Sequence, residues 1–169
     1  MNRIEKIFQY RTEKVIPFLT AGYPSKNDTL SMVLAAEKSG AAMIELGMPF
    51  SDPLADGPIV QHSSQIAIEN GVDILWILDL VRSIRLKSDI PIALMGYINP
   101  IIKFGIKDFI ENCSLSGVDG LIFPDMPPEE ATSYVEISKE NNICPILLVS
   151  PNTPDNRIKQ ISIISSALI

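Results

Sequence analysis

The sequence predicts an α/β protein in which short buried strands alternate with longer helices around a parallel sheet. Short apolar runs recur along the chain, and each is nearly continuous, as expected of a strand that is buried on both faces. Longer segments with helical spacing separate them, which is typical of repeated βα units. The expected strands are residues 15–20, 42–46, 90–95, 120–123 and 145–149.

Residues that favour the starts and ends of helices support the prediction of helices between these strands. Several segments open on Asp, Ser or Pro, which favour the first positions of a helix. Asn70-Gly71 and Ser39-Gly40 close two of them, because glycine adopts the left-handed conformation found at many helix ends. The expected helices are residues 27–39, 58–69, 73–87, 107–116, 128–141 and 154–162. The second is an insertion into a βα loop, where functional residues are often placed.

Counting units separates two architectures. A (β/α)8 barrel of about 250 residues uses about 31 residues for each unit, so 169 residues hold five units and the start of a sixth strand at 166–169. The alternative, an open doubly wound sheet, would carry a glycine-rich phosphate turn after its first strand. Residues 20–24 hold one glycine. We therefore predict a TIM barrel that is incomplete, with residues 1–169 forming a single domain truncated at its C-terminal side.

Composition excludes several classes of function. Fourteen basic against twenty acidic residues give a net charge of −6, without the Lys/Arg stripe that nucleic-acid binding needs. The N-terminus lacks the apolar core of a signal peptide, and no apolar run reaches the ~18 residues of a membrane span. We expect a soluble, cytoplasmic protein that binds neither nucleic acid nor membrane. Its two cysteines, Cys113 and Cys144, have no metal-ligand spacing and are expected to pack as free thiols.

Two carboxylates near the end of the second predicted strand are the candidates for chemistry. Glu45 lies inside an apolar strand, where an unpaired carboxylate is costly, so it must pair with a cation, face a polar cavity or take part in a reaction. Burial would raise its pKa. Asp56 follows in the loop, where it either joins the same site or caps the helix beginning at Pro58. Two carboxylates at one strand end indicate acid/base chemistry.

Four segments resemble the tryptophan synthase alpha subunit family, in order and at the family's spacing along the full chain. They are PFLT at 17–20, IELGMPFSDPLADGP at 44–58 with Gln61, LMGYIN at 94–99 and FPDMPPEE at 123–130. The resemblance implies an eight-stranded barrel of tryptophan biosynthesis that cleaves indole-3-glycerol phosphate to indole and glyceraldehyde 3-phosphate. It also implies an α2β2 assembly with a beta subunit that carries pyridoxal phosphate. No cofactor or metal is implied for the alpha subunit itself.

The same resemblance assigns roles to individual residues. Glu45 would be the principal proton-transfer residue, and Asp56 would accept the indole N–H and stabilise the positive charge that develops on the ring nitrogen. Phe18, Met95 and Leu148, at the ends of three other strands, resemble the family's indole pocket. These five residues form the predicted active site.

A loop beside this site resembles the family's contact with the beta subunit. Its residues are Pro49, Ser51, Asp52 and Pro53, although turn-forming residues alone would give the same pattern. Asp125 either orders a neighbouring active-site loop or ends the fourth strand before two prolines.

Three further polar residues have local explanations. His62, in the inserted helix, is expected at the surface or in packing, and Glu129 and Glu130 are expected in the first turn of a helix, where acids match the helix dipole.

The predicted barrel stops as its sixth strand begins. The flexible loop after that strand, strands seven and eight, and the phosphate site that barrels commonly build from the last βα loops would lie outside the chain. We expect a fragment of a longer protein that is active as a lyase when the remaining third is present. The alternative is a truncated, non-catalytic remnant that at most binds a beta-type partner. A barrel of the indole-glycerol-phosphate-forming type is disfavoured, because residues 15–20 contain no lysine.

Overall fold

The computed structural model describes residues 1–9 and 13–165, and their strands form one parallel sheet in the order β1-β2-β3-β4-β5. Strand order in the sheet follows chain order, as in a barrel, whereas in a doubly wound sheet the strand order reverses at one point. The five predicted strands are thereby confirmed, and the predicted start of strand six lies outside the described residues. The strands are β1 (Phe18–Thr20), β2 (Ile44–Gly47), β3 (Ile92–Met95), β4 (Gly120–Ile122) and β5 (Cys144–Ile146).

The observed strands are shorter than expected, for local reasons. The first strand begins at Phe18 rather than at residue 15, because Pro17 has no N–H to donate to the sheet. At the other edge, β5 ends at Ile146 rather than at residue 149, and the next N–H, that of Leu147, donates to the Ser165 hydroxyl.

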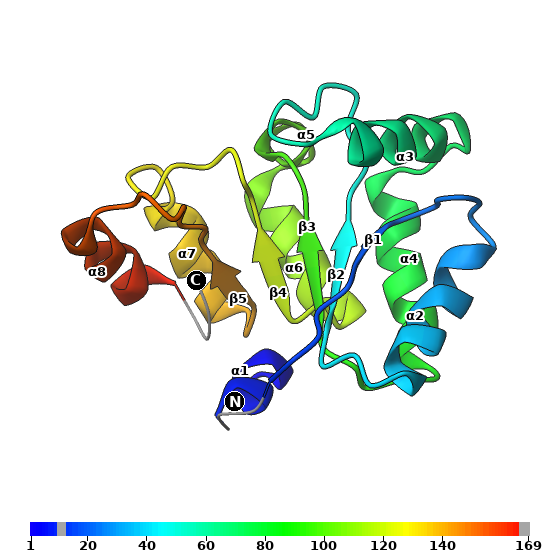
Figure 1. Cartoon of the computed structure of the whole chain (residues 1–169), viewed down its shortest axis with the longest axis horizontal. Helices are drawn as coiled ribbons and strands as arrows, with labels where there is room; N and C mark the ends of the chain where they lie inside the picture. Colours follow the sequence, from blue (N-terminus) through cyan, green and yellow to red (C-terminus); the bar gives the residue numbers. More distant parts are fainter. Residues whose placement is uncertain (10–12, 166–169) are drawn as a thin grey trace.

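The helices surround the sheet in three groups, which Figure 1 shows in relation to the strands. One group packs on the outer side of the sheet, α3 and α5 lie above the carboxyl ends of the strands, and α1 lies at the amino ends. The outer helices are α2 (Asp28–Lys38), α4 (Ile74–Arg85), α6 (Ile106–Ser116), α7 (Thr132–Glu140) and α8 (Asp155–Ile164). The others are α1 (Arg3–Phe8), α3 (Pro58–Glu69) and α5 (Ile98–Phe104).

Helix α7 begins four residues later than predicted. Pro128 and the two residues after it form a turn, in which the Glu130 N–H donates to the Pro127 carbonyl. The expectation that Glu129 and Glu130 occupy the first helical turn is therefore wrong. Glu129 instead forms a two-pronged ion pair with Arg157 of α8, at 2.6 and 3.2 Å, and this pair lowers the pKa of Glu129.

Helix α1 closes the amino-terminal end of the sheet. The side chain of its N-cap, Asn2, accepts a hydrogen bond from the Ile4 N–H, and the Asn2 N–H donates one to the Glu5 carboxylate, both at 2.8 Å. The Asn2 amide also donates to the carbonyls of Asp119 and Asn142, at 2.8 and 2.7 Å. These contacts hold the fully buried Ile4 side chain against the inner side of the sheet.

The strand register sorts the side chains into two layers. Leu46, Leu94 and Leu121 lie side by side in register and belong to the large core beneath the helices. Because neighbouring residues of a strand point to opposite faces, Glu45 and its register partner Ala93 point to the inner side. The buried apolar side chains on the inner side include Met43, Ala93, Ile122, Cys144 and Ile146.

No helix among residues 1–9 and 13–165 is long and apolar enough to cross a membrane. Both cysteines are free and buried, and burial raises the pKa of Cys144 to about 12. This fits the predicted packing role.

Candidate active site

Glu45 projects from β2 to the inner side of the sheet, between its register partners Phe18 on β1 and Ala93 on β3. The side chain is half-buried, and this burial raises its pKa above the ordinary value of 4.5. Within the described part of the chain, no cation pairs with the carboxylate. The ion-pair explanation therefore fails there, which leaves a polar cavity or chemistry. A raised pKa suits a carboxyl group that exchanges protons near neutral pH.

Asp56 lies in the loop between β2 and α3, and its backbone is fixed on both sides. Its N–H donates to the Pro53 carbonyl at 3.0 Å, and its carbonyl accepts from the Gln61 amide at 2.9 Å. The carboxylate does not cap α3, whose N-cap is Gly57. It accepts a hydrogen bond from the Tyr97 hydroxyl at 2.9 Å instead. The cap explanation for Asp56 is therefore wrong.

The carboxyl ends of the first three strands enclose a small hollow of about 20 Å³, which Phe18, Asp56 and Met95 help to line. The Phe18 ring lies across Gly47, where a Cβ atom would come within 2.4 Å of its Cζ. Glycine at the end of β2 is thus what allows an aromatic ring to cover this strand.

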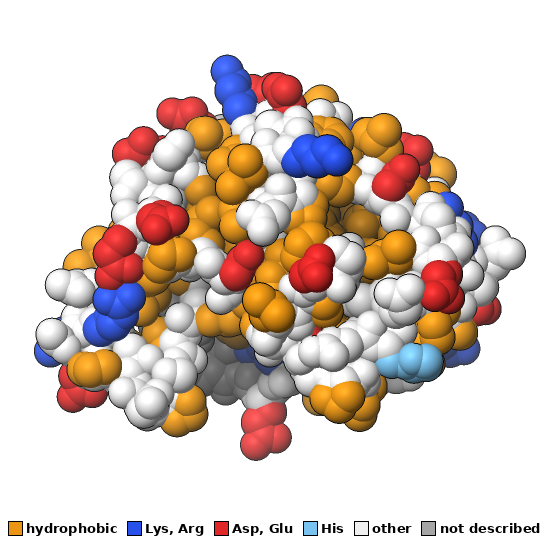
Figure 2. Space-filling model, turned by 90° about the horizontal axis from the view of Figure 1, so that it is seen from above, with side chains coloured by type: hydrophobic (Ala, Val, Ile, Leu, Met, Phe, Trp, Pro, Cys, Tyr) orange, Lys and Arg blue, Asp and Glu red, His pale blue; other side chains and the backbone are white. Residues whose placement is uncertain are grey.

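A larger hollow of about 450 Å³ adjoins the same residues and is bordered by Asp56, Met95 and Leu148. Its volume is typical of small-molecule sites. Figure 2 looks down on this end of the molecule, where hydrophobic side chains make up much of the surface and acidic side chains lie among them. Glu45 lines neither hollow, since it is one layer deeper in the sheet, below the row that contains Gly47 and Met95.

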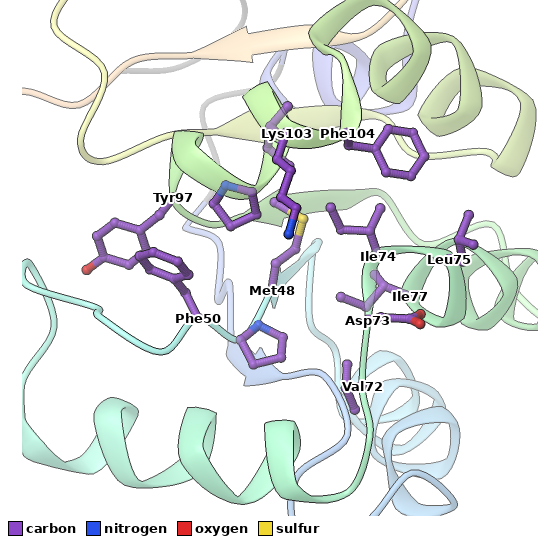
Figure 3. Close-up of a pocket in the computed structure, with 13 residues that line it drawn as sticks. Met48, Phe50, Val72, Asp73, Ile74, Leu75, Ile77, Tyr97, Lys103 and Phe104 are labelled. Atoms are coloured by element: carbon purple, nitrogen blue, oxygen red, sulfur yellow. The ribbon is translucent and has the colours of Figure 1, made fainter.

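The loop of residues 48–57 separates these hollows from a third cavity. That cavity has a volume of about 440 Å³ and is mostly apolar. It lies between this loop, the start of α4 and helix α5 (Figure 3). Pro49 borders it, whereas Pro53 borders the small hollow. Asp52 is exposed and accepts a hydrogen bond from the Ser51 hydroxyl at 2.5 Å.

Two large apolar side chains next to this loop face solvent. Leu54 is 91% exposed and Ile59 is 84% exposed. Apolar side chains this exposed at one place favour a protein contact.

Tyr97 is a site residue that the sequence did not reveal. It lies two residues beyond β3, and its hydroxyl reaches a carboxylate 41 positions earlier in the chain. Asp125 supports the same region, because both of its carboxylate oxygens accept from the Ile98 N–H, at 3.1 and 3.2 Å. This contact favours the first of the two explanations for Asp125, the ordering of a neighbouring loop.

His62 is exposed on α3, as expected. Among residues 1–9 and 13–165, no group of three His, Cys, Asp or Glu side chains converges to hold a metal ion.

Comparisons with known proteins agree with this fold. The family model described as "Tryptophan synthase alpha chain" matches residues 4–169. The chain is 41% identical over 170 residues to the tryptophan synthase alpha chain of Flavobacterium psychrophilum, covering 100% of this chain and 67% of that protein. It is 43% identical to the one of Prosthecochloris aestuarii, covering 98% and 64%.

Solved structures give the same result. Tryptophan synthase subunit alpha from Legionella pneumophila matches with a TM-score of 0.95 at 36% identity, over 99% of this chain and 66% of that one. A tryptophan synthase complex from Pyrococcus furiosus matches with a TM-score of 0.87 at 42% identity, over 90% and 63%. The fold is therefore the TIM barrel of these proteins in part, and the chain spans about two thirds of the length of its relatives.

Proposed function

The chain belongs to the tryptophan synthase alpha chain family, and from this premise we propose that it carries the catalytic carboxylates of a carbon–carbon lyase. The reaction is the cleavage of indole-3-glycerol phosphate to indole and glyceraldehyde 3-phosphate in tryptophan biosynthesis. The observation that supports this most is Glu45, which is half-buried on the inner side of the sheet, has a raised pKa and has no cation partner in the described part of the chain.

The residues account for each step of a retro-aldol cleavage. A proton adds to the indole ring carbon that bears the glycerol chain, and a base removes the proton of the adjacent glycerol hydroxyl. The carbon–carbon bond then breaks, its electrons return to the ring, and an aldehyde leaves. Glu45 transfers protons, because burial raises its pKa above the ordinary value, which makes its carboxyl group a better proton carrier than an exposed glutamate. Asp56 accepts a hydrogen bond from the indole N–H, and its negative charge offsets the positive charge on the ring nitrogen.

Phe18, Met95 and Leu148 provide the apolar contacts for the indole ring. They border the two hollows at the carboxyl ends of the strands, and both hollows also contain Asp56. Barrels commonly bind a substrate phosphate with the loops after strands seven and eight, so full activity requires the remaining third of the barrel. Without it, the same chain would be a non-catalytic remnant.

We further propose that the loop containing Pro49, Asp52 and Pro53 contacts a beta subunit in an α2β2 complex. The exposed Leu54 and Ile59 beside it support a protein contact at this place. Two relatives from Pyrococcus furiosus were solved as a tryptophan synthase complex and as an a2b2 complex. The pyridoxal phosphate of that complex would belong to the beta subunit.

The test is indole release from indole-3-glycerol phosphate, with the beta subunit present. It compares this chain, and the full gene product if the gene continues past Ile169, with the same proteins carrying Glu45→Gln. We expect at least a 100-fold loss of kcat for Glu45→Gln. The matched control is Glu136→Gln, an exposed position on α7, which should stay within two-fold of the unsubstituted protein.

Cleavage that survives Glu45→Gln would contradict the assignment of Glu45. No cleavage by any folded form, the full gene product included, would contradict the lyase and leave the remnant that binds a beta-type partner.

A further inference from the structure

We infer that Tyr97 is a positioning residue of this site, which holds the Asp56 carboxylate in place for the indole N–H. The inference rests on the proposed function, because it gives Asp56 its task. Tyr97 contacts no reacting atom and acts through Asp56.

One hydroxyl group fixes both the side chain and the backbone at Asp56. The Tyr97 hydroxyl accepts a hydrogen bond from the Ala55 N–H at 2.8 Å and donates its single proton to Asp56 Oδ2 at 2.9 Å. Burial, followed by the hydrogen bond to Asp56, raises the pKa of Tyr97 above its ordinary value of 10.0. The hydroxyl therefore stays protonated and keeps donating at any pH where the protein works.

The tyrosine ring is itself held in place by its surroundings. It is 7% exposed and packs against Phe50, with 5.3 Å between ring centroids and 31° between ring planes. Figure 3 shows these two rings side by side, with the Tyr97 hydroxyl directed away from the apolar cavity. The next residue, Ile98, donates its N–H to Asp125. The tyrosine thus belongs to the connection between β3 and α5, and it contacts the 48–57 loop through both its ring and its hydroxyl.

This arrangement leaves one oxygen of Asp56 free for a ligand. Within residues 1–9 and 13–165, Oδ2 accepts from Tyr97 while Oδ1 accepts from no protein donor. A loop carboxylate that must meet a developing positive charge is most effective when it is oriented before the reaction begins. Loss of the tyrosine hydroxyl should therefore affect the chemical step more than the binding of the uncharged ring.

The test is Tyr97→Phe, which keeps the ring and removes the hydroxyl, in the full gene product with the beta subunit. We expect kcat for indole release to fall about 10-fold or more. The dissociation constant of a non-cleavable indole alkyl phosphate should change less than three-fold. The control is Tyr134→Phe, which removes a buried hydroxyl that donates to the Leu121 carbonyl on the outer side of the sheet. It should lower stability and leave kcat within two-fold.

A double-substitution cycle with Asp56→Asn separates positioning from a general structural effect. If Tyr97 acts through Asp56, Tyr97→Phe should lower kcat less than two-fold in the Asp56→Asn background. A full 10-fold loss in that background, or no loss in the unsubstituted background, would overturn the role of Tyr97 and leave the lyase intact. No cleavage by the unsubstituted protein would overturn the proposed function, and the role of Tyr97 with it.

Discussion

Two buried or half-buried carboxylates of the same sheet, Asp119 and Glu45, have opposite surroundings. Asp119 lies just before β4 at the amino end and is 3% exposed. Its Oδ2 accepts from Arg85 at 2.7 Å and from the Ile92 N–H at 2.9 Å, and its Oδ1 accepts from Arg3 at 3.1 Å. Glu45, inside β2 on the inner side of the sheet, has no such donor within the described residues, and burial raises its pKa.

The difference shows that one sheet uses carboxylates for two purposes, stability and proton exchange. A fully paired carboxylate ties neighbouring elements together, since the donors to Asp119 come from α1, α4 and β3. An unpaired one reduces stability, yet it remains free to exchange a proton. The predictions below test this division.

The largest effect is expected at the paired carboxylate, Asp119. Asp119→Ala leaves the Arg85 guanidinium and the Ile92 N–H without their acceptor, and should lower the free energy of unfolding by about 3–5 kcal/mol. Urea denaturation followed by circular dichroism measures this change. Asp89→Ala is the matched control, because Asp89 pairs with the same Arg3 but its side chain is 93% exposed. A cost for Asp119→Ala no greater than that of the control would contradict the stabilising role.

At the unpaired carboxylate, Glu45, substitution should stabilise the protein. A raised folded-state pKa means that Glu45 holds its proton more tightly in the fold, so wild-type stability falls as pH rises from the unfolded-state pKa through the folded-state pKa. Glu45→Gln removes this loss. We expect a gain on the order of 1 kcal/mol at pH 7–8, since solvent screens part of the penalty at a half-buried side chain.

The pH dependence provides the internal control for Glu45→Gln. The gain should disappear below the unfolded-state pKa, at about pH 4, where both forms are uncharged. Urea denaturation at the two pH values tests it. A loss of stability at neutral pH would mean that Glu45 has a favourable partner after all.

The smallest effect is expected for an ion pair at the surface. Glu129→Gln breaks the ion pair with Arg157. The Glu129 side chain is 62% exposed and the Arg157 side chain is 42% exposed. Water and salt screen such a pair, so the urea midpoint should remain within measurement error at 0.15 M salt. A clear decrease would show that pairing at this exposed position also stabilises the fold.

Sequence patterns were sufficient for the parts of the fold that local physics determines. Strand order and five of the six expected helices follow from short apolar runs, helical spacing and end signals such as Gly40 and Gly71, which adopt positive φ angles as expected. The remaining helix, α7, was also expected, but its predicted start was four residues too early. Glu45 was identifiable because a carboxylate within an apolar strand is unusual enough to need an explanation.

Features that depend on distant contacts were not visible in the sequence. Helices α1 and α5 have only six and seven residues, which is too short for a periodic pattern, and long-range hydrogen bonds support both. Tyr97 belongs to a segment that resembles the family, yet its role depends on a contact across 41 residues. The side-chain packing that brings Phe50 against Tyr97 likewise required the structure.

The Asn2 contacts of helix α1 also bear on how the chain folds during synthesis. Asn2 leaves the ribosome long before its two acceptors, which lie 117 and 140 positions later in the chain. Bringing together ends so far apart has a large entropic cost, and synthesis proceeds at about 5–20 residues per second. Asn2 and helix α1 therefore wait several seconds for their docking site. A nascent chain that stalls before Asn142 leaves the apolar face of α1 uncovered, where chaperones can bind it.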